Sequence, residues 1–145
     1  MNIKIKNYVI YVAMCLTIFL SFSAFAQFQD DFSDGNLNQN PTWLGDAANF
    51  MVNTNNELQL NAPNSGISQL YVNAPTADST VWEFYVNLDF APSTSNQLKV
   101  YLSSNNSDFS ASLNGYYVLI GESGTNDAIE LMRQDGSSST MLIRG

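Results

Sequence analysis

Beyond residue 27 the chain alternates apolar and polar positions with a period of two. From Thr80 to Phe90, every second residue starting at Trp82 is apolar, and the residues between include Glu83 and Asp89. Gln97 to Ser103 repeats the pattern, with two leucines and a valine on one side. Alternation of this kind predicts strands with one buried face. Trp82 and the Leu/Val positions are therefore expected to point into the core.

Shorter runs of the same character predict further strands, separated by turns rich in Asn, Ser and Gly. They are Phe28 to Phe32, Phe50 to Val52, Glu57 to Leu60, Gln69 to Val72, Tyr116 to Ile120, Ile129 to Arg133 and Thr140 to Ile143. Gln134 to Ser137 is typical of a hairpin turn, because Asp-Gly favours the positive φ that tight turns need. No window sustains the 3.6-residue spacing of an amphipathic helix. The pattern predicts one all-β domain, an antiparallel β-sandwich or jelly roll.

The N-terminal segment has the three parts of a secretory signal peptide. Two lysines lie in Met1 to Asn7, an apolar run covers Tyr8 to Phe22, and Ala24 and Ala26 occupy the −3 and −1 positions before Gln27. We expect cleavage after Ala26, which leaves residues 27–145 as a secreted or cell-surface domain, with no membrane contact after cleavage. An uncleaved membrane anchor is the alternative reading.

Charge and composition exclude several classes of function. The 145 residues carry 5 Lys+Arg and 13 Asp+Glu, for a formal net charge of −8, with no His and one Cys. Phosphate neutralisation needs clustered basic residues, so a nucleic-acid partner is excluded. Without His, neither an imidazole triad nor a His-based zinc site can form. Cys15 falls in the predicted signal, so the exported domain has no disulfide and depends on its core.

Several segments resemble one family of bacterial secreted proteins. Phe28 to Gly35 (FQDDFSDG) and Asn40 to Trp43 are similar to the first strand of concanavalin A-like lectin/glucanase jelly rolls, as found at the N-terminus of proteins with lamin-tail domains. Trp82 to Val86, Leu113 to Val118 and Leu131 to Gly136 resemble middle strands of the same module. The resemblance implies a jelly-roll fold and further domains in the same polypeptide. Its motifs are structural and imply no activity.

Catalytic signatures are missing from the sequence. Glucanases of this fold use Glu-x-Asp-x-x-Glu on one strand, because retaining hydrolysis needs two carboxylates about 5 Å apart. Glu83 and Asp89 lie about 20 Å apart along a predicted strand, at 3.3 Å per residue. We therefore expect no enzyme in this segment and name no catalytic residue. An accessory role in a glycoside hydrolase, with catalytic residues beyond residue 145, is one alternative.

Calcium is the metal that the side chains could hold, because hard cations prefer carboxylate and carbonyl oxygens. Asp30, Asp31 and Asp34 are the candidate ligands. Their spacing departs from the alternating acids of a calcium loop. The competing interpretation is that Asp34 and Gly35 form a turn while Asp30 and Asp31 face water.

Aromatic residues provide the candidate glycan site. If their strands are neighbours, Tyr85, Tyr101 and Tyr117 share the face opposite the Leu/Val core, together with Asn87 and Lys99. Sugars stack on such rings, and their hydroxyl groups pair with polar side chains. The alternative is that these tyrosines pack across strands. Trp43 is assigned to the core.

Together these patterns predict a non-catalytic carbohydrate-binding or adhesion module of a larger protein, contacting glycans or extracellular matrix. A structural spacer without a ligand is a further alternative. The Phe28 to Phe32 strand should pair with a late strand, whereas the chain ends in the apolar run Met141 to Ile143. We therefore expect residues 27–145 to be an incomplete domain that associates through unpaired edges.

Overall fold

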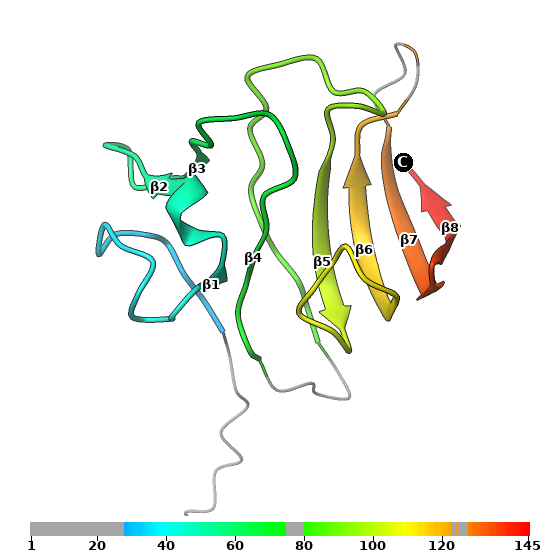
Figure 1. Ribbon diagram of the computed structural model, residues 1–145, viewed down its shortest axis with the longest axis horizontal. Helices are drawn as coiled ribbons and strands as arrows, with labels where there is room; N and C mark the ends of the chain where they lie inside the picture. The colour runs from blue at the N-terminus through cyan, green and yellow to red at the C-terminus, as the bar shows by residue number, and fades with distance from the viewer. Residues whose placement is uncertain (1–27, 75–79, 123, 125–127) are drawn as a thin grey trace, which may run out of the picture.

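A computed structural model describes residues 28–74, 80–122, 124 and 128–145. Its largest element is an antiparallel sheet of four strands that lie side by side in chain order (Figure 1). These strands are β5 (Leu98–Ser104), β6 (Leu113–Ile120), β7 (Ile129–Gly136) and β8 (Ser138–Arg144). No helix in this part of the chain has the length and apolarity to cross a membrane.

The turn between β7 and β8 follows from its sequence. β7 ends at Gly136, whose φ is +64°, and β8 begins two residues later at Ser138. Glycine adopts this left-handed backbone conformation without the steric penalty of a Cβ atom. The hairpin predicted at Gln134 to Ser137 is therefore confirmed.

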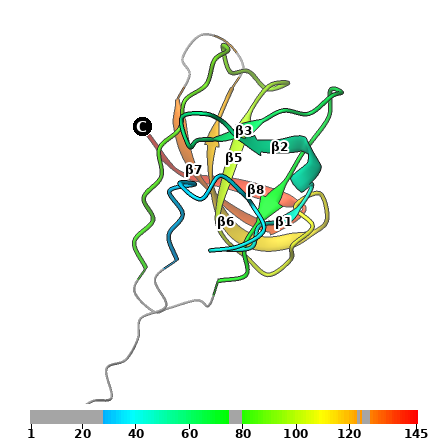
Figure 2. The ribbon, with the colours of Figure 1, turned by 90° about the vertical axis from the view of Figure 1, so that its left-hand side faces the viewer.

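Four short strands form two separate antiparallel pairs beside the large sheet (Figure 2). β1 (Leu44–Gly45) pairs with β4 (Leu70–Tyr71), and β2 (Phe50–Val52) pairs with β3 (Leu58–Leu60). A 3-10 helix, η1 (Ala47–Asn49), leads into β2.

The turn between β2 and β3 is organised by one asparagine side chain. The Oδ1 atom of Asn53 accepts the backbone N–H groups of Asn55 at 2.9 Å and Glu57 at 3.0 Å. Asn56 has a φ of +61°, a conformation that Asn tolerates better than most residues. This local bonding explains why the Asn-rich segment turns, as its composition predicts.

The all-β, antiparallel prediction is confirmed, with shifts at the strand ends. Phe50–Val52 is found as predicted, whereas β7 runs on from the predicted end at Arg133 to Gly136. The other predicted strands of the second half, Gln97 to Ser103, Tyr116 to Ile120 and Thr140 to Ile143, correspond to β5, β6 and β8.

Two predicted strands are not strands in the structure. Between Val81 and Leu88, no backbone hydrogen bond reaches another described segment, so the alternating sequence has no ladder partner. We call Val81–Leu88 the unpaired segment. Phe28 to Phe32 is broken because Phe32 has a φ of +54° and its N–H donates to the Asp30 side chain at 2.7 Å.

The buried core lies on the tyrosine side of the large sheet, contrary to the prediction. Leu113 and Tyr117, four residues apart on β6 and thus on one face, are each 2% exposed. Ala128 is the other buried apolar residue of the described chain. The expected inward residues of β5, which are Leu98, Val100 and Leu102, are half-buried. Trp82, also expected inside, is 46% exposed because its segment has no neighbouring strand to cover it.

Candidate functional site

Two of the three tyrosines of the predicted glycan site lie together in the structure, but other side chains cover them. Tyr101 of β5 lies directly opposite Tyr117 of β6, with ring centroids 5.0 Å apart. Phe109, from the loop between these strands, stacks on Tyr101 at 4.4 Å with an interplanar angle of 5°. Tyr117 is buried and Tyr101 half-buried, so this pair offers no open ring face to a sugar. The expectation that both tyrosines point outward is wrong, because Phe109 packs over that face.

The two hydroxyl groups link strands of the sheet. Tyr101 O–H donates to Gln134 Oε1 at 2.7 Å, and Tyr117 O–H donates to Ser139 Oγ at 3.0 Å. Burial, with a smaller contribution from Tyr117, raises the pKa of Tyr101. Lys99 Nζ lies 5.2 Å from the centroid of the Tyr117 ring, within the range of a cation–π contact. These contacts are cross-strand packing, the alternative reading of the tyrosines.

The structure does not place Tyr85 and Asn87, the other predicted glycan contacts, beside Tyr101 and Tyr117. Tyr85 and Asn87 lie on the unpaired segment, where the Tyr85 side chain is 85% exposed and Asn87 is exposed. Within the described chain, the Tyr85 ring contacts neither Tyr101 nor Tyr117. The five predicted residues thus divide into three on the sheet, of which Lys99 is exposed and the two tyrosines are covered, and an exposed pair on the unpaired segment.

The three predicted calcium ligands act as acceptors for nearby backbone N–H groups. Asp30 Oδ1 accepts from Phe32, Asp31 Oδ1 from Ser33 at 3.0 Å, and Asp34 Oδ1 from Asn36 at 3.2 Å. Hydrogen bonds from the Ser33 side chain and then its backbone lower the pKa of Asp31. In the part of the chain that the structure describes, no three His, Cys, Asp or Glu side chains are grouped to hold a metal ion. The competing turn interpretation agrees with the bonding of Asp34 and with the exposure of Asp31. Asp30 differs from it, because this residue is half-buried and also accepts a hydrogen bond from the Trp43 indole.

An open groove of about 400 Å³ lies beside these acids, and the sequence did not indicate it. It is lined by Trp43, by residues of the loop before this tryptophan, by Ala47 of η1 and by the residues of β2. The lining includes the amide side chains of two asparagines and several apolar side chains, which are Asn36, Asn38, Leu37, Trp43, Phe50 and Met51.

Trp43 is fixed in place by its neighbours. Its indole Nε1–H donates to Asp30 Oδ2 at 2.7 Å. Phe32 stacks against the indole at 5.9 Å, and Phe28 meets it edge-on at 5.9 Å. The Trp43 backbone N–H donates to Leu37 O at 2.8 Å. A half-buried tryptophan held by these contacts is a rigid apolar surface.

Of the two asparagine side chains in the groove, one is hydrogen-bonded within the protein and the other is not. Asn36 Nδ2 donates to Asp34 O at 3.2 Å, and Asn36 Oδ1 accepts from the Asn38 N–H at 3.1 Å. Asn38 is exposed, and the described chain offers its side-chain amide no hydrogen-bond partner. Its backbone is anchored by a bridge to Thr42. The Asn38 side-chain amide therefore lies at the groove on an anchored backbone, with two donors and an acceptor available.

Sequence reasoning missed this groove because it assigned Trp43 to the core. The groove depends on the contact between Asp30 and Trp43, and on β2 lying beside the loop at Leu37 and Asn38. A usable sequence signal was the pair of asparagines, at positions 36 and 38, shortly before a tryptophan. No family model, curated protein or solved structure matches this chain.

Proposed function

We propose that this protein is a non-catalytic carbohydrate-binding or adhesion module, exported to the cell surface or the medium, and that Trp43 and Asn38 form its sugar contact. The observation that carries the proposal is the groove of about 400 Å³. It combines the Trp43 indole, which is hydrogen-bonded to Asp30, with the Asn38 side-chain amide, which has no hydrogen-bond partner in the described chain. Small-molecule sites are concave and mostly apolar, with a few placed polar groups. The apolar face of a pyranose ring packs on an indole, and its hydroxyl groups bind amides.

Charge narrows the class of sugar. Asp30, Asp31 and Asp34 line a neighbouring hollow of about 350 Å³, and the chain has a net charge of −8. Like charges repel an approaching anionic ligand, most strongly at low ionic strength. The expected ligands are therefore neutral glycans or glycans with amino groups. Polymers of uronic acids or sulfated sugars are expected to bind poorly.

A glycan array followed by titration calorimetry tests the proposal. Asn38→Ala should weaken binding by about fivefold, which corresponds to the loss of one hydrogen bond of about 1 kcal/mol. Asn64→Ala is the matched control, because Asn64 is also an exposed loop asparagine and lies outside the groove. Equal affinities for the two variants would remove the groove from consideration. A wild-type protein that binds no glycan on a broad array would favour the structural spacer.

A further inference from the structure

The large sheet ends in an edge strand with no partner among the described residues. β8 pairs with β7 on one side, and all seven of its residues are exposed. Figure 1 places it on the side of the sheet away from β1 to β4. The unpaired N–H and C=O groups of such an edge are a template for another strand.

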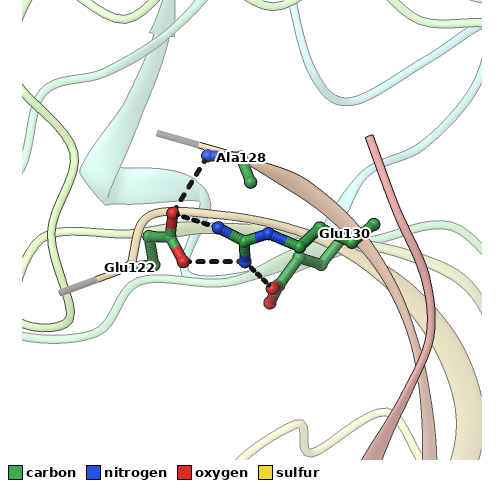
Figure 3. Close-up of polar contacts among 4 residues, drawn as sticks. Glu122, Ala128 and Glu130 are labelled. Carbon is green, nitrogen blue, oxygen red and sulfur yellow. Dashed lines mark hydrogen bonds and ion pairs between the residues drawn. The ribbon is translucent and has the colours of Figure 1, made fainter. Parts of the chain in front are cut away.

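Edge strands are commonly protected by lysine, proline or an inward-pointing charge. β8 contains neither Lys nor Pro, and its one charged side chain, Arg144, is folded back onto Glu122 and Glu130 (Figure 3). Its one irregularity is a bulge, because Met141 and Ile143 pair with consecutive residues of β7. Met141 is 50% exposed and Ile143 62% exposed. The edge thus offers both backbone groups and apolar side chains.

Charge indicates which partner suits this edge. A second copy of this acidic chain is repelled wherever acids face acids. Antiparallel pairing of β8 with itself about Met141 places Ser138 opposite Arg144 and sets no two charges against each other. β8 contains no acidic residue, so repulsion between acids does not oppose the pairing of this strand with a second copy of itself.

We propose that β8 pairs antiparallel with β8 of a second copy, across a two-fold axis at Met141, which joins the two large sheets into one. A two-fold contact uses the same surface on both subunits, so it closes at a dimer. This interaction surface is separate from the groove at Trp43 and does not depend on glycan binding.

Light scattering coupled to size-exclusion chromatography tests for the dimer. The wild type should elute as a concentration-dependent dimer. Met141→Lys should raise the dimer dissociation constant at least about tenfold, because two lysines would meet on the axis. Val81→Lys is the control, since Val81 is an apolar residue of 92% exposure away from the edge, and it should dimerise like the wild type. A monomeric wild type, or equal effects of the two substitutions, would overturn the proposal.

Cross-linking tests the register independently of stability. In a Cys15→Ser background, Met141→Cys should form an intermolecular disulfide, since opposite residues in antiparallel strands have Cα atoms about 5 Å apart. Ser138→Cys should not, because its two copies would lie about 20 Å apart along the strand. Cross-linking at position 138 but not at 141 would contradict the proposed pairing. Circular dichroism of each variant checks that the fold is kept.

Discussion

Arg144 and Glu122 are joined by two hydrogen bonds, from Nη1 to Oε2 at 2.8 Å and from Nη2 to Oε1 at 2.6 Å (Figure 3). Nη1 also contacts Glu130 of β7. Glu122 in turn accepts the Ala128 backbone N–H at 3.4 Å. The end of β8 is thereby tied both to its neighbouring strand and to the segment that follows β6.

This arrangement predicts acid sensitivity. The hydrogen bond from Arg144 lowers the pKa of Glu122 below its ordinary value of 4.5. Because the folded-state pKa is the lower one, the contribution to stability is complete above the ordinary value and is lost as pH falls through the folded-state value. The melting temperature should therefore fall below about pH 4.5, and Glu122→Gln should weaken that dependence. Glu83→Gln, an exposed glutamate outside the cluster, should leave the profile unchanged.

The buried position of Tyr117 predicts a large difference between two tyrosine substitutions. Tyr117→Ala should lower the free energy of unfolding by about 3–5 kcal/mol, as for other large core residues. Tyr85→Ala should change it by less than about 0.5 kcal/mol, because its side chain is 85% exposed. Urea denaturation of both variants measures the difference. Similar losses would show that the core does not lie on the tyrosine side.

The hairpin at Gly136 predicts an order among substitutions at one position. Gly136→Ala should destabilise by about 1–2 kcal/mol, because a φ of +64° brings Cβ close to the carbonyl oxygen. Gly136→Asn should be milder, since Asn visits this conformation more readily. Thermal unfolding of the two variants gives the comparison. If Ala proves as stable as Gly, the turn does not require the left-handed conformation.

The N-terminal pattern predicts a defined mature end. N-terminal sequencing of exported protein should begin at Gln27, because Ala24 and Ala26 provide the small residues of a cleavage site. Replacing Ala26 by a bulky residue, as in Ala26→Phe, should block cleavage and retain the protein with the membrane. Detection of the peptide around Lys4 in wild-type exported material would restore the anchor reading.

The second half of the fold was predictable because its information is local. The alternation of β5, the residues of the Gln134 to Ser137 turn and the apolar run of β6 each specify structure within a few residues. The choice of buried face was not predictable. β5 has apolar side chains on both faces, with leucines and a valine on one and Tyr101 on the other. Which face is buried depends on Phe109, which lies outside the strand and stacks on Tyr101.

The failed predictions share a dependence on distant partners. The residues from Thr80 to Phe90 alternate as a strand should, yet a strand exists only where another segment bonds to it. The Trp43 groove likewise depends on the hydrogen bond to Asp30, thirteen residues away. Neither relationship leaves a periodic signal in the sequence. The contacts of Tyr101 and Tyr117 are those of the cross-strand packing alternative, and the contacts of Asp31 and Asp34 are those of the turn alternative.

Because β5 to β8 occur in the sheet in the order in which they occur in the chain, each pairing closes only a short loop. Folding rates rise as contacts become more local. The pairing of β1 with β4, by contrast, closes a longer loop, because β2 and β3 lie between them in the chain. Pulse-labelled hydrogen exchange should therefore find the amides of β6 protected before those of β1. Although the ribosome makes β5 to β8 after β1 to β4, the later strands are expected to fold first.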